Sequence, residues 1–163
     1  MPGSNSVLKE GIIAGVIGAM TVAVWFLIVD SIATHAFYTP NMLGAGVASV
    51  LGGAALPGMF ENVAVYTVFH FAAFCAAGTL LAWIFHRAET EPSVLVIFVL
   101  LFIIFELGAI GLVALLAEAG MKALAWYQIA AGNVLASVAM GWYLWRAHPA
   151  LRSELENAIE GEG

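Results

Sequence analysis

Four long runs of apolar residues, separated by short segments rich in polar residues, glycine or proline, dominate the hydrophobic pattern of this chain. The runs cover about 8–34, 60–86, 92–117 and 122–146. Each is long enough to cross a bilayer, which takes about 20 apolar residues in a helix. Short connections place consecutive helices antiparallel. The pattern predicts an all-α integral membrane protein with four transmembrane helices in an up-down-up-down bundle.

The segment between the first two runs is too short and too polar to span a membrane. Thr39 followed by Pro40 is typical of a helix start, because proline is favoured at the first helical position. Two consecutive glycines, Gly52 and Gly53, then interrupt the apolar pattern. We expect a short helix over about 40–51 in the first outer loop, lying in the membrane interface, with a re-entrant helix as the alternative.

The C-terminal segment 149–163 has a different pattern. Leu151, Leu155 and Ile159 recur every fourth residue among charged side chains, which predicts a short amphipathic helix. Its polar face is acidic and therefore poorly suited to anionic lipid headgroups. A protein partner and simple solvation of this cytoplasmic tail both remain open. The whole chain, 1–163, is interpreted as one membrane domain.

The few basic residues set the orientation. Lys9, Arg87, Arg146 and Arg152 fall on one side of the four-span arrangement, and Lys122 falls on the other. Cytoplasmic loops carry the excess of lysine and arginine. We therefore expect a multi-pass protein of a bacterial-type inner (plasma) membrane with both termini in the cytoplasm.

Composition agrees with a lipid environment and excludes several partners. Of the 163 residues, 63% are hydrophobic and 10% are charged, against about 25% charged in soluble domains. Eleven acidic and five basic residues give a net charge of −6, so no basic surface is expected for nucleic acid. The single cysteine, Cys75, has no second thiol for a disulfide or a thiolate metal cluster.

Small residues recur on one face of the first run. Gly11, Gly15, Ala19 and Ala23 are four residues apart, the spacing that lets two helix backbones approach closely. Asp30 follows on the same face and should point into the bundle near the outer surface. With His35 it forms a candidate outer-side polar pair, although two ligands alone do not specify a site.

Three polar residues occur deep inside the predicted spans. Counting about 1.5 Å per residue puts His70, Glu106 and Asn133 at a similar depth, roughly 12 to 15 Å below the outer surface. Ala73 and Ala77 share the face of His70 and should pack inward with it, and small residues likewise share the face of Asn133. A lipid-facing Glu106 would be costly. We expect a candidate intramembrane cluster in which the three side chains hydrogen-bond to one another.

This cluster has three interpretations. The favoured one is structural, with the polar groups satisfying each other and fixing the helix register. An acid and an imidazole could instead carry protons or ions. A metal or haem at His70, with Glu106 as second ligand, is disfavoured, because His35 is predicted at the outer edge and His86 and His148 at the inner edge as ordinary boundary residues. No cofactor and no metal site are expected.

No catalytic motif is found, and we expect the protein not to be an enzyme. Small size and small-residue faces favour a non-catalytic accessory or assembly subunit of a larger membrane complex. The alternative is a small homo-oligomeric transporter or channel that uses the intramembrane cluster. The expected partners are membrane lipid and either other membrane proteins or further copies of the chain.

Overall fold

A computed structural model describes residues 4–33, 35–50, 58–91, 93, 94, 96, 99, 100, 103, 126–151 and 153. Its elements are helices: α1 (Ser4–Ile32), α2 (Tyr38–Val50), α3 (Met59–Ala88) and α5 (Trp126–Ala147). They match three of the predicted runs and the short outer helix to within a few residues. No strand occurs in the part of the chain described.

Two of these helices are long and apolar enough to cross a membrane, namely α1 over Ser6–Ile32 and α3 over Met59–Ala88. Only 33% and 28% of their most apolar stretches are buried inside the molecule. A core helix of a soluble protein would be covered by its neighbours, whereas these helices leave large apolar side chains outside. The finding indicates membrane association. Most of the predicted third run, 92–117, lies outside the described residues, as does most of the tail 149–163.

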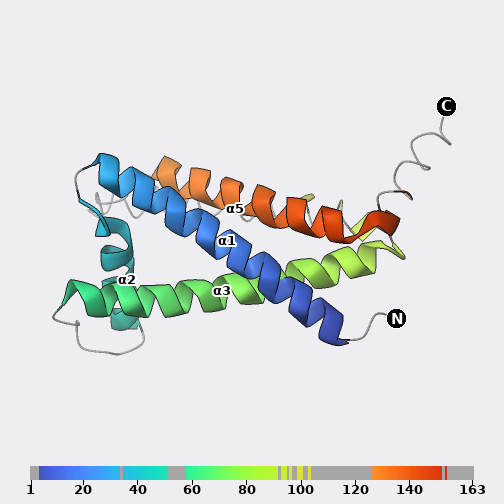
Figure 1. Ribbon diagram of the computed structural model, residues 1–163, viewed down its shortest axis with the longest axis horizontal. Helices are drawn as coiled ribbons and strands as arrows, with labels where there is room; N and C mark the ends of the chain where they lie inside the picture. The colour runs from blue at the N-terminus through green and yellow to red at the C-terminus, as the bar shows by residue number, and fades with distance from the viewer. Residues whose placement is uncertain are drawn as a thin grey trace.

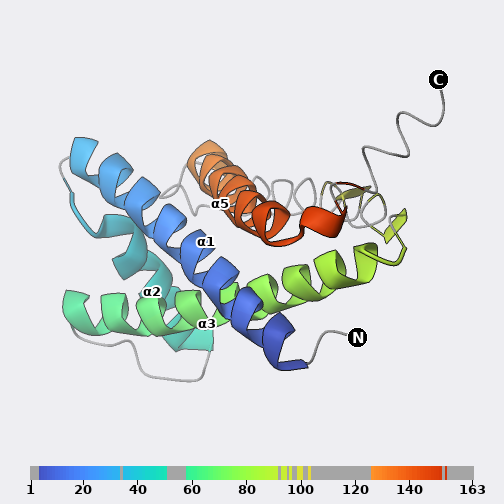
Figure 2. The ribbon, with the colours of Figure 1, turned by 45° about the vertical axis from the view of Figure 1, so that its right-hand side comes forward.

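The helices form an arrangement in which α1 crosses the other two long helices (Figures 1 and 2). The first residues of α1 lie at the same end of the molecule as the last residues of α3 and α5 (Figure 1). Helix α1 therefore runs against both α3 and α5, and these two run in the same direction. The short helix α2 lies at the opposite end, between α1 and the beginning of α3.

The crossing of α1 and α3 brings two backbones into direct contact. A side chain at Gly11 or Gly15 would overlap backbone atoms of Thr79 or Cys75, and one at Gly78 would overlap the backbone of α1. Glycine is required here because any Cβ would push the helices apart. The sequence prediction that this face of α1 meets another helix is confirmed for Gly11, Gly15 and Ala19, whereas Ala23 is exposed.

Helices α1 and α5 are joined nearer the other end. Val22, Phe26 and Ala136 form a small buried cluster there. The indole Nε1 of Trp25 donates a 2.9 Å hydrogen bond to the backbone oxygen of Gln128. A buried indole N–H needs such a partner, so this bond and the apolar contacts together fix the height of α5 against α1.

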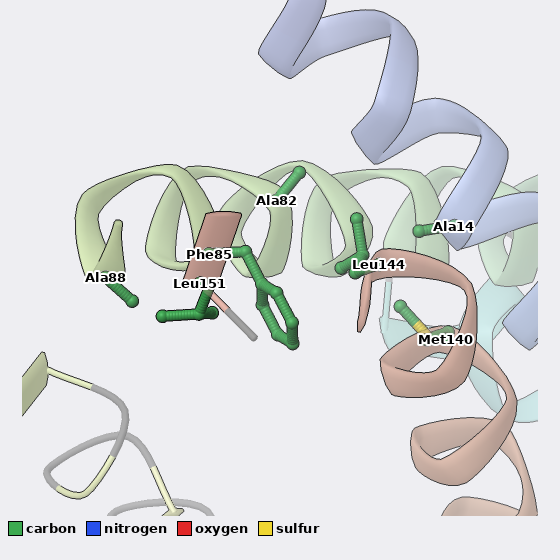
Figure 3. Packing of buried hydrophobic residues seen from close by; sticks show 7 residues of the cluster. All are labelled: Ala14, Ala82, Phe85, Ala88, Met140, Leu144 and Leu151. Carbon is green, nitrogen blue, oxygen red and sulfur yellow. The ribbon is translucent and has the colours of Figure 1, made fainter. Parts of the chain in front are cut away.

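The largest buried cluster lies where α3 and α5 end (Figure 3). Leu151 and Leu144 are completely buried, and Phe85 lies beside Leu151. Full burial of a leucine side chain contributes about 1.5 to 3 kcal/mol. Leu151 is the first of the three regularly spaced apolar residues in the segment predicted as an amphipathic tail and is packed against the bundle, whereas Leu155 and Ile159 lie outside the described residues. The full cluster comprises Ala14, Ala82, Phe85, Ala88, Met140, Leu144 and Leu151.

Helix α2 is fixed to α3 by its own small and polar residues. The amide nitrogen of Asn62 donates a 3.0 Å hydrogen bond to the side-chain oxygen of Asn41. Gly44 lies against the backbone of Asn62 and leaves no space for a side chain. The chain enters α2 through Phe37, whose φ of 66° is left-handed and costs about 1 to 2 kcal/mol outside glycine.

Candidate functional site

A cluster of two histidines and two glutamates lies where the three long helices converge. Glu10 comes from the beginning of α1, and His86 comes from the last turn of α3. Glu89 is the C-cap residue of α3, and His148 follows directly after α5. We call this group the Glu/His junction. Its members come from three segments that are far apart in sequence.

Local structure explains why these residues meet. The close glycine crossing places the beginning of α1 against the last part of α3. The apolar cluster around Phe85 and Leu144 holds the end of α5 against the same part of α3 (Figure 3). The amide N–H of His148 donates a 3.1 Å bond to the carbonyl of Leu144, and Pro149 follows. His148 is thus held at the helix end, beside the ring of Phe85 with centroids 5.8 Å apart.

Both histidines point their Nε2 atoms at one carboxylate oxygen. The Oε2 atom of Glu10 lies 3.1 Å from Nε2 of His86 and 3.2 Å from Nε2 of His148. The other nitrogen of His148, Nδ1, lies 2.7 Å from Oε1 of Glu89. The two imidazole rings meet edge to face with centroids 4.4 Å apart. One glutamate oxygen therefore bridges two rings, and His148 connects two glutamates.

Burial differs among the four side chains. His148 is 2% exposed and His86 is 12% exposed, whereas Glu10 and Glu89 are about one-quarter exposed. The Nδ1 atom of His86 is buried without a hydrogen-bond partner, and the nearest carboxylate oxygen, Oε2 of Glu89, is 3.9 Å away. An unsatisfied buried nitrogen is costly. The histidine nitrogens are thus withdrawn from water, while the glutamates keep the junction accessible from one side.

The donor set of the junction suits a cation. Carboxylate oxygens only accept hydrogen bonds, so the 2.7 Å contact with Glu89 needs a proton on Nδ1 of His148. The two contacts with Glu10 need either a proton on each Nε2 or a cation bound by the oxygen and the nitrogens together. Glu10, His86 and His148 each offer one ligand atom, and these atoms lie within 4.8 Å of one another. It is the one such group of three found in the described part of the chain.

The intramembrane cluster predicted from depth is brought together only in part. His70 is buried and its Nε2 donates a 3.1 Å hydrogen bond to the backbone oxygen of Ala19 on α1. The ring also lies against Tyr66 and Phe74, with centroids 5.0 and 4.7 Å away. Glu106 lies outside the described residues.

Asn133 lies on α5 and is half-buried. No hydrogen bond joins it to His70 among the residues that are described. The faces also differ from expectation, because Ala73 and Ala77, predicted to pack inward with His70, are exposed. His70 instead packs at the edge of the α1–α3 contact, where Ala19 supplies its partner.

The two members of the predicted outer-side pair, Asp30 and His35, each have another hydrogen-bond partner. Asp30 is 4% exposed, as expected for an inward-pointing residue. Its two carboxylate oxygens accept 2.8 Å hydrogen bonds from the backbone N–H and the hydroxyl of Thr39 at the start of α2. His35 is exposed, and its Nδ1 donates to the carbonyl of Ala33 at 2.8 Å. Both line a cavity of about 320 Å³, but no hydrogen bond connects their side chains.

Sequence reasoning assigned His86 and His148 to the membrane boundary and did not single out Glu10 or Glu89. Polar residues at the span ends, like those at the span centres, can lie at equal depth. In the four-span arrangement these four residues fall on the same, inner side of the bilayer. That coincidence was the available signal for the junction.

No protein family, no curated protein and no solved structure matches this chain.

Proposed function

We propose that this chain is a four-span membrane protein with both termini in the cytoplasm, working as a non-catalytic accessory or assembly subunit of a larger membrane complex. The topology is supported by the shared direction of α3 and α5. Because both helices end at the same side of the molecule, the chain between them has to return to the opposite side. The sequence of that connection includes the apolar run 92–117, whose length suits a span.

The orientation is supported by the basic residues at the junction end. Lys9, Arg87 and Arg146 all lie near the ends of α1, α3 and α5 that meet there. The guanidinium of Arg146 lies over the ring of Trp142, 4.9 Å from its centroid. Tryptophan and arginine are both typical of the membrane interface, and the excess of basic residues marks the cytoplasmic side. The junction would then face the cytoplasm of a bacterial-type cell.

One observation carries the accessory role, namely the exposed small-residue face of α3. Ala72, Ala73, Ala76 and Ala77 recur at helical spacing and are all exposed. Surfaces that only contact lipid need no small residues, whereas alanine lets a second helix approach closely. We therefore expect this face to receive a helix of a partner membrane protein.

The exposed faces of α1 and α5 have a different character. They carry large aliphatic residues such as Ile12, Val16, Val134 and Val138, each at least 39% exposed. These side chains fit lipid acyl chains, which make no demand for close backbone approach. Helix α3 also exposes Val68, Phe69 and Leu80, so the contrast concerns the alanine patch alone and not the whole helix.

The transport alternative has less support. His70 lines a cavity of about 240 Å³, but its Nε2 is bonded to the backbone of Ala19 and its ring lies against Tyr66 and Phe74. An imidazole held in this way acts as a link between two helices.

Extraction of the tagged protein in mild detergent, followed by mass spectrometry, tests the proposal. We expect larger membrane proteins to co-purify in fixed stoichiometry. The double variant Ala73→Leu, Ala76→Leu should lose them, because leucine blocks close helix approach. Ala64→Leu is the matched control, since Ala64 is exposed on α3 but lies off this face. A homo-oligomer would favour transport, and a monomer without partners would contradict the accessory role.

A further inference from the structure

We propose that Glu10, His86 and His148 bind one divalent transition-metal ion that clamps the cytoplasmic ends of α1, α3 and α5 together. Glu89 would act as the hydrogen-bond partner that orients the histidines. This inference is independent of the accessory role, because it concerns the chain alone and its test involves no partner protein.

The first argument is the spacing of the ligand atoms. Metal–ligand bonds of about 2.0 to 2.2 Å in a tetrahedral zinc site put neighbouring ligand atoms roughly 3.3 Å apart. The Oε2 atom of Glu10 lies 3.1 and 3.2 Å from the two Nε2 atoms. These separations match two edges of such a polyhedron. The ion would enter with small side-chain adjustments and replace the protons between these atoms.

The second argument is the orientation of His148. A histidine that binds a metal through one nitrogen almost always donates its other N–H to a carboxylate or a carbonyl. Nδ1 of His148 lies 2.7 Å from Oε1 of Glu89, while Nε2 faces the proposed metal position. With protons alone, the ring is an imidazolium whose two N–H groups donate to the two glutamates. A metal at Nε2 leaves one proton, on Nδ1, where Glu89 accepts it.

The third argument is the unpartnered nitrogen of His86. Its Nδ1 is buried and lies 3.9 Å from Oε2 of Glu89. Metal binding at Nε2 would fix the proton on Nδ1, and a small rotation of Glu89 would then bring an acceptor to it. One glutamate would thus serve both histidines. The two outer-shell contacts involve the same residue, as expected for a site built around one ion.

Charge also favours a cation at this position. Glu10 and Glu89 bring two negative charges, and Arg87, which follows His86 in the sequence, is paired with Glu91 at 3.6 Å. The ligand set of two imidazoles and one carboxylate suits zinc, iron and related ions better than magnesium or calcium, which prefer oxygen ligands. Three protein ligands leave a further position for water.

Equilibrium dialysis of the full-length protein tests the site. The chain is purified in detergent with a tag that lacks histidine, stripped with a chelator and dialysed against Zn²⁺. We expect about one tightly bound zinc ion per chain, as for a three-ligand site. His86→Gln and His148→Gln should lose this ion. His35→Gln is the matched control, because His35 is exposed at the opposite end and should retain it.

Glu89→Gln separates a metal site from a fold that has simply been lost. Glutamine keeps the shape and one acceptor oxygen but removes the charge, so the helices stay together. We expect the zinc stoichiometry to persist while affinity falls by about 10- to 100-fold, as outer-shell changes typically do. A wild-type chain that binds no zinc, or zinc binding that survives both histidine substitutions, would overturn the proposal.

Discussion

Helix α1 carries one carboxylate near each end, and the two are used in opposite ways. Both carboxylate oxygens of Asp30 accept hydrogen bonds from Thr39, one from its backbone N–H and one from its hydroxyl. Among the described residues, Glu10 contacts two histidine nitrogens, one from α3 and one from beyond α5, and its side chain is about one-quarter exposed. Each end also has a nearby histidine, yet His35 is exposed and His148 is buried.

This difference shows which polar residues of a helical membrane protein can bind a ligand. A buried carboxylate whose two oxygens both hold a helix start would have to give up those hydrogen bonds to bind a ligand. A carboxylate that satisfies only side chains can exchange those contacts for an ion. The accessory role and the metal clamp make separate demands on the molecule, and the contrast between its two ends can be tested directly.

The largest effect should come from disrupting the close crossing of α1 and α3, which holds the two ends of the molecule in place. Gly78→Leu places a side chain into the backbone of α1, and rigid helices cannot absorb it. We expect a loss of about 3 kcal/mol in the free energy of unfolding, measured by denaturant titration in mixed micelles. Gly141→Leu is the control, because a Cβ atom added there meets no atom within 4 Å. Equal losses of unfolding free energy in the two variants would contradict the close approach of α1 and α3 at Gly78.

Removing the shared histidine of the junction should have the next largest effect. His148→Leu leaves Glu10 and Glu89 without their 3.2 and 2.7 Å contacts. Because both glutamates are partly exposed and can turn to water, we expect a loss of about 2 kcal/mol, below the cost of stranding a fully buried charge. His35→Leu, measured the same way without added metal, should change stability by less than about 0.5 kcal/mol.

The opposite end should be less sensitive. Asp30→Ala removes both acceptors of Thr39, whose side chain is 2% exposed. We expect a loss of about 1.5 kcal/mol, in the range of helix-capping changes. Protection of the α2 amides against hydrogen exchange should fall, while zinc binding at the junction stays unchanged. Reduced zinc binding in this variant would show that the two ends are coupled.

The smallest effect is expected in the middle of the bundle. His70→Leu removes one hydrogen bond to the carbonyl of Ala19 but keeps the apolar contacts with Tyr66 and Phe74. Interhelical hydrogen bonds in membranes average about 0.6 kcal/mol, so we expect a loss of that size in the free energy of unfolding. A loss several times larger would show that His70 has partners beyond this carbonyl.

Much of the fold could be predicted from the sequence because lipid imposes a strict pattern. Helices α1 and α3 and the short α2 follow from the lengths of apolar runs and from Thr39-Pro40. The small residues Gly11, Gly15 and Ala19 correctly indicated the close helix contact, whereas Ala23, on the same stripe, is exposed. The exposure of Ala73 and Ala77 could not be predicted, since small residues mark a packing face without showing which helix fills it.

The candidate site was harder to predict for a specific reason. Equal depth suggested that His70 and Asn133 would meet, but α1 packs between parts of α3 and α5 and supplies Ala19 as the partner of His70. Equal depth fixes only the position of a residue along the membrane normal. Whether two side chains meet also depends on which helices are in contact. At the junction, all three long helices converge, so residues of equal depth do meet. Glu10, His86 and His148 are the result.

The most direct measurement is the thermal-unfolding midpoint with and without zinc for the wild type, His148→Gln and His70→Gln. At a zinc concentration about 100-fold above the dissociation constant, ligand linkage predicts a rise of roughly 5 to 10 °C in the wild type. The same rise is expected for His70→Gln, and none for His148→Gln. A rise that is equal in all three proteins, or absent from the wild type, would contradict the assignment of the Glu/His junction as the metal-binding end of the molecule.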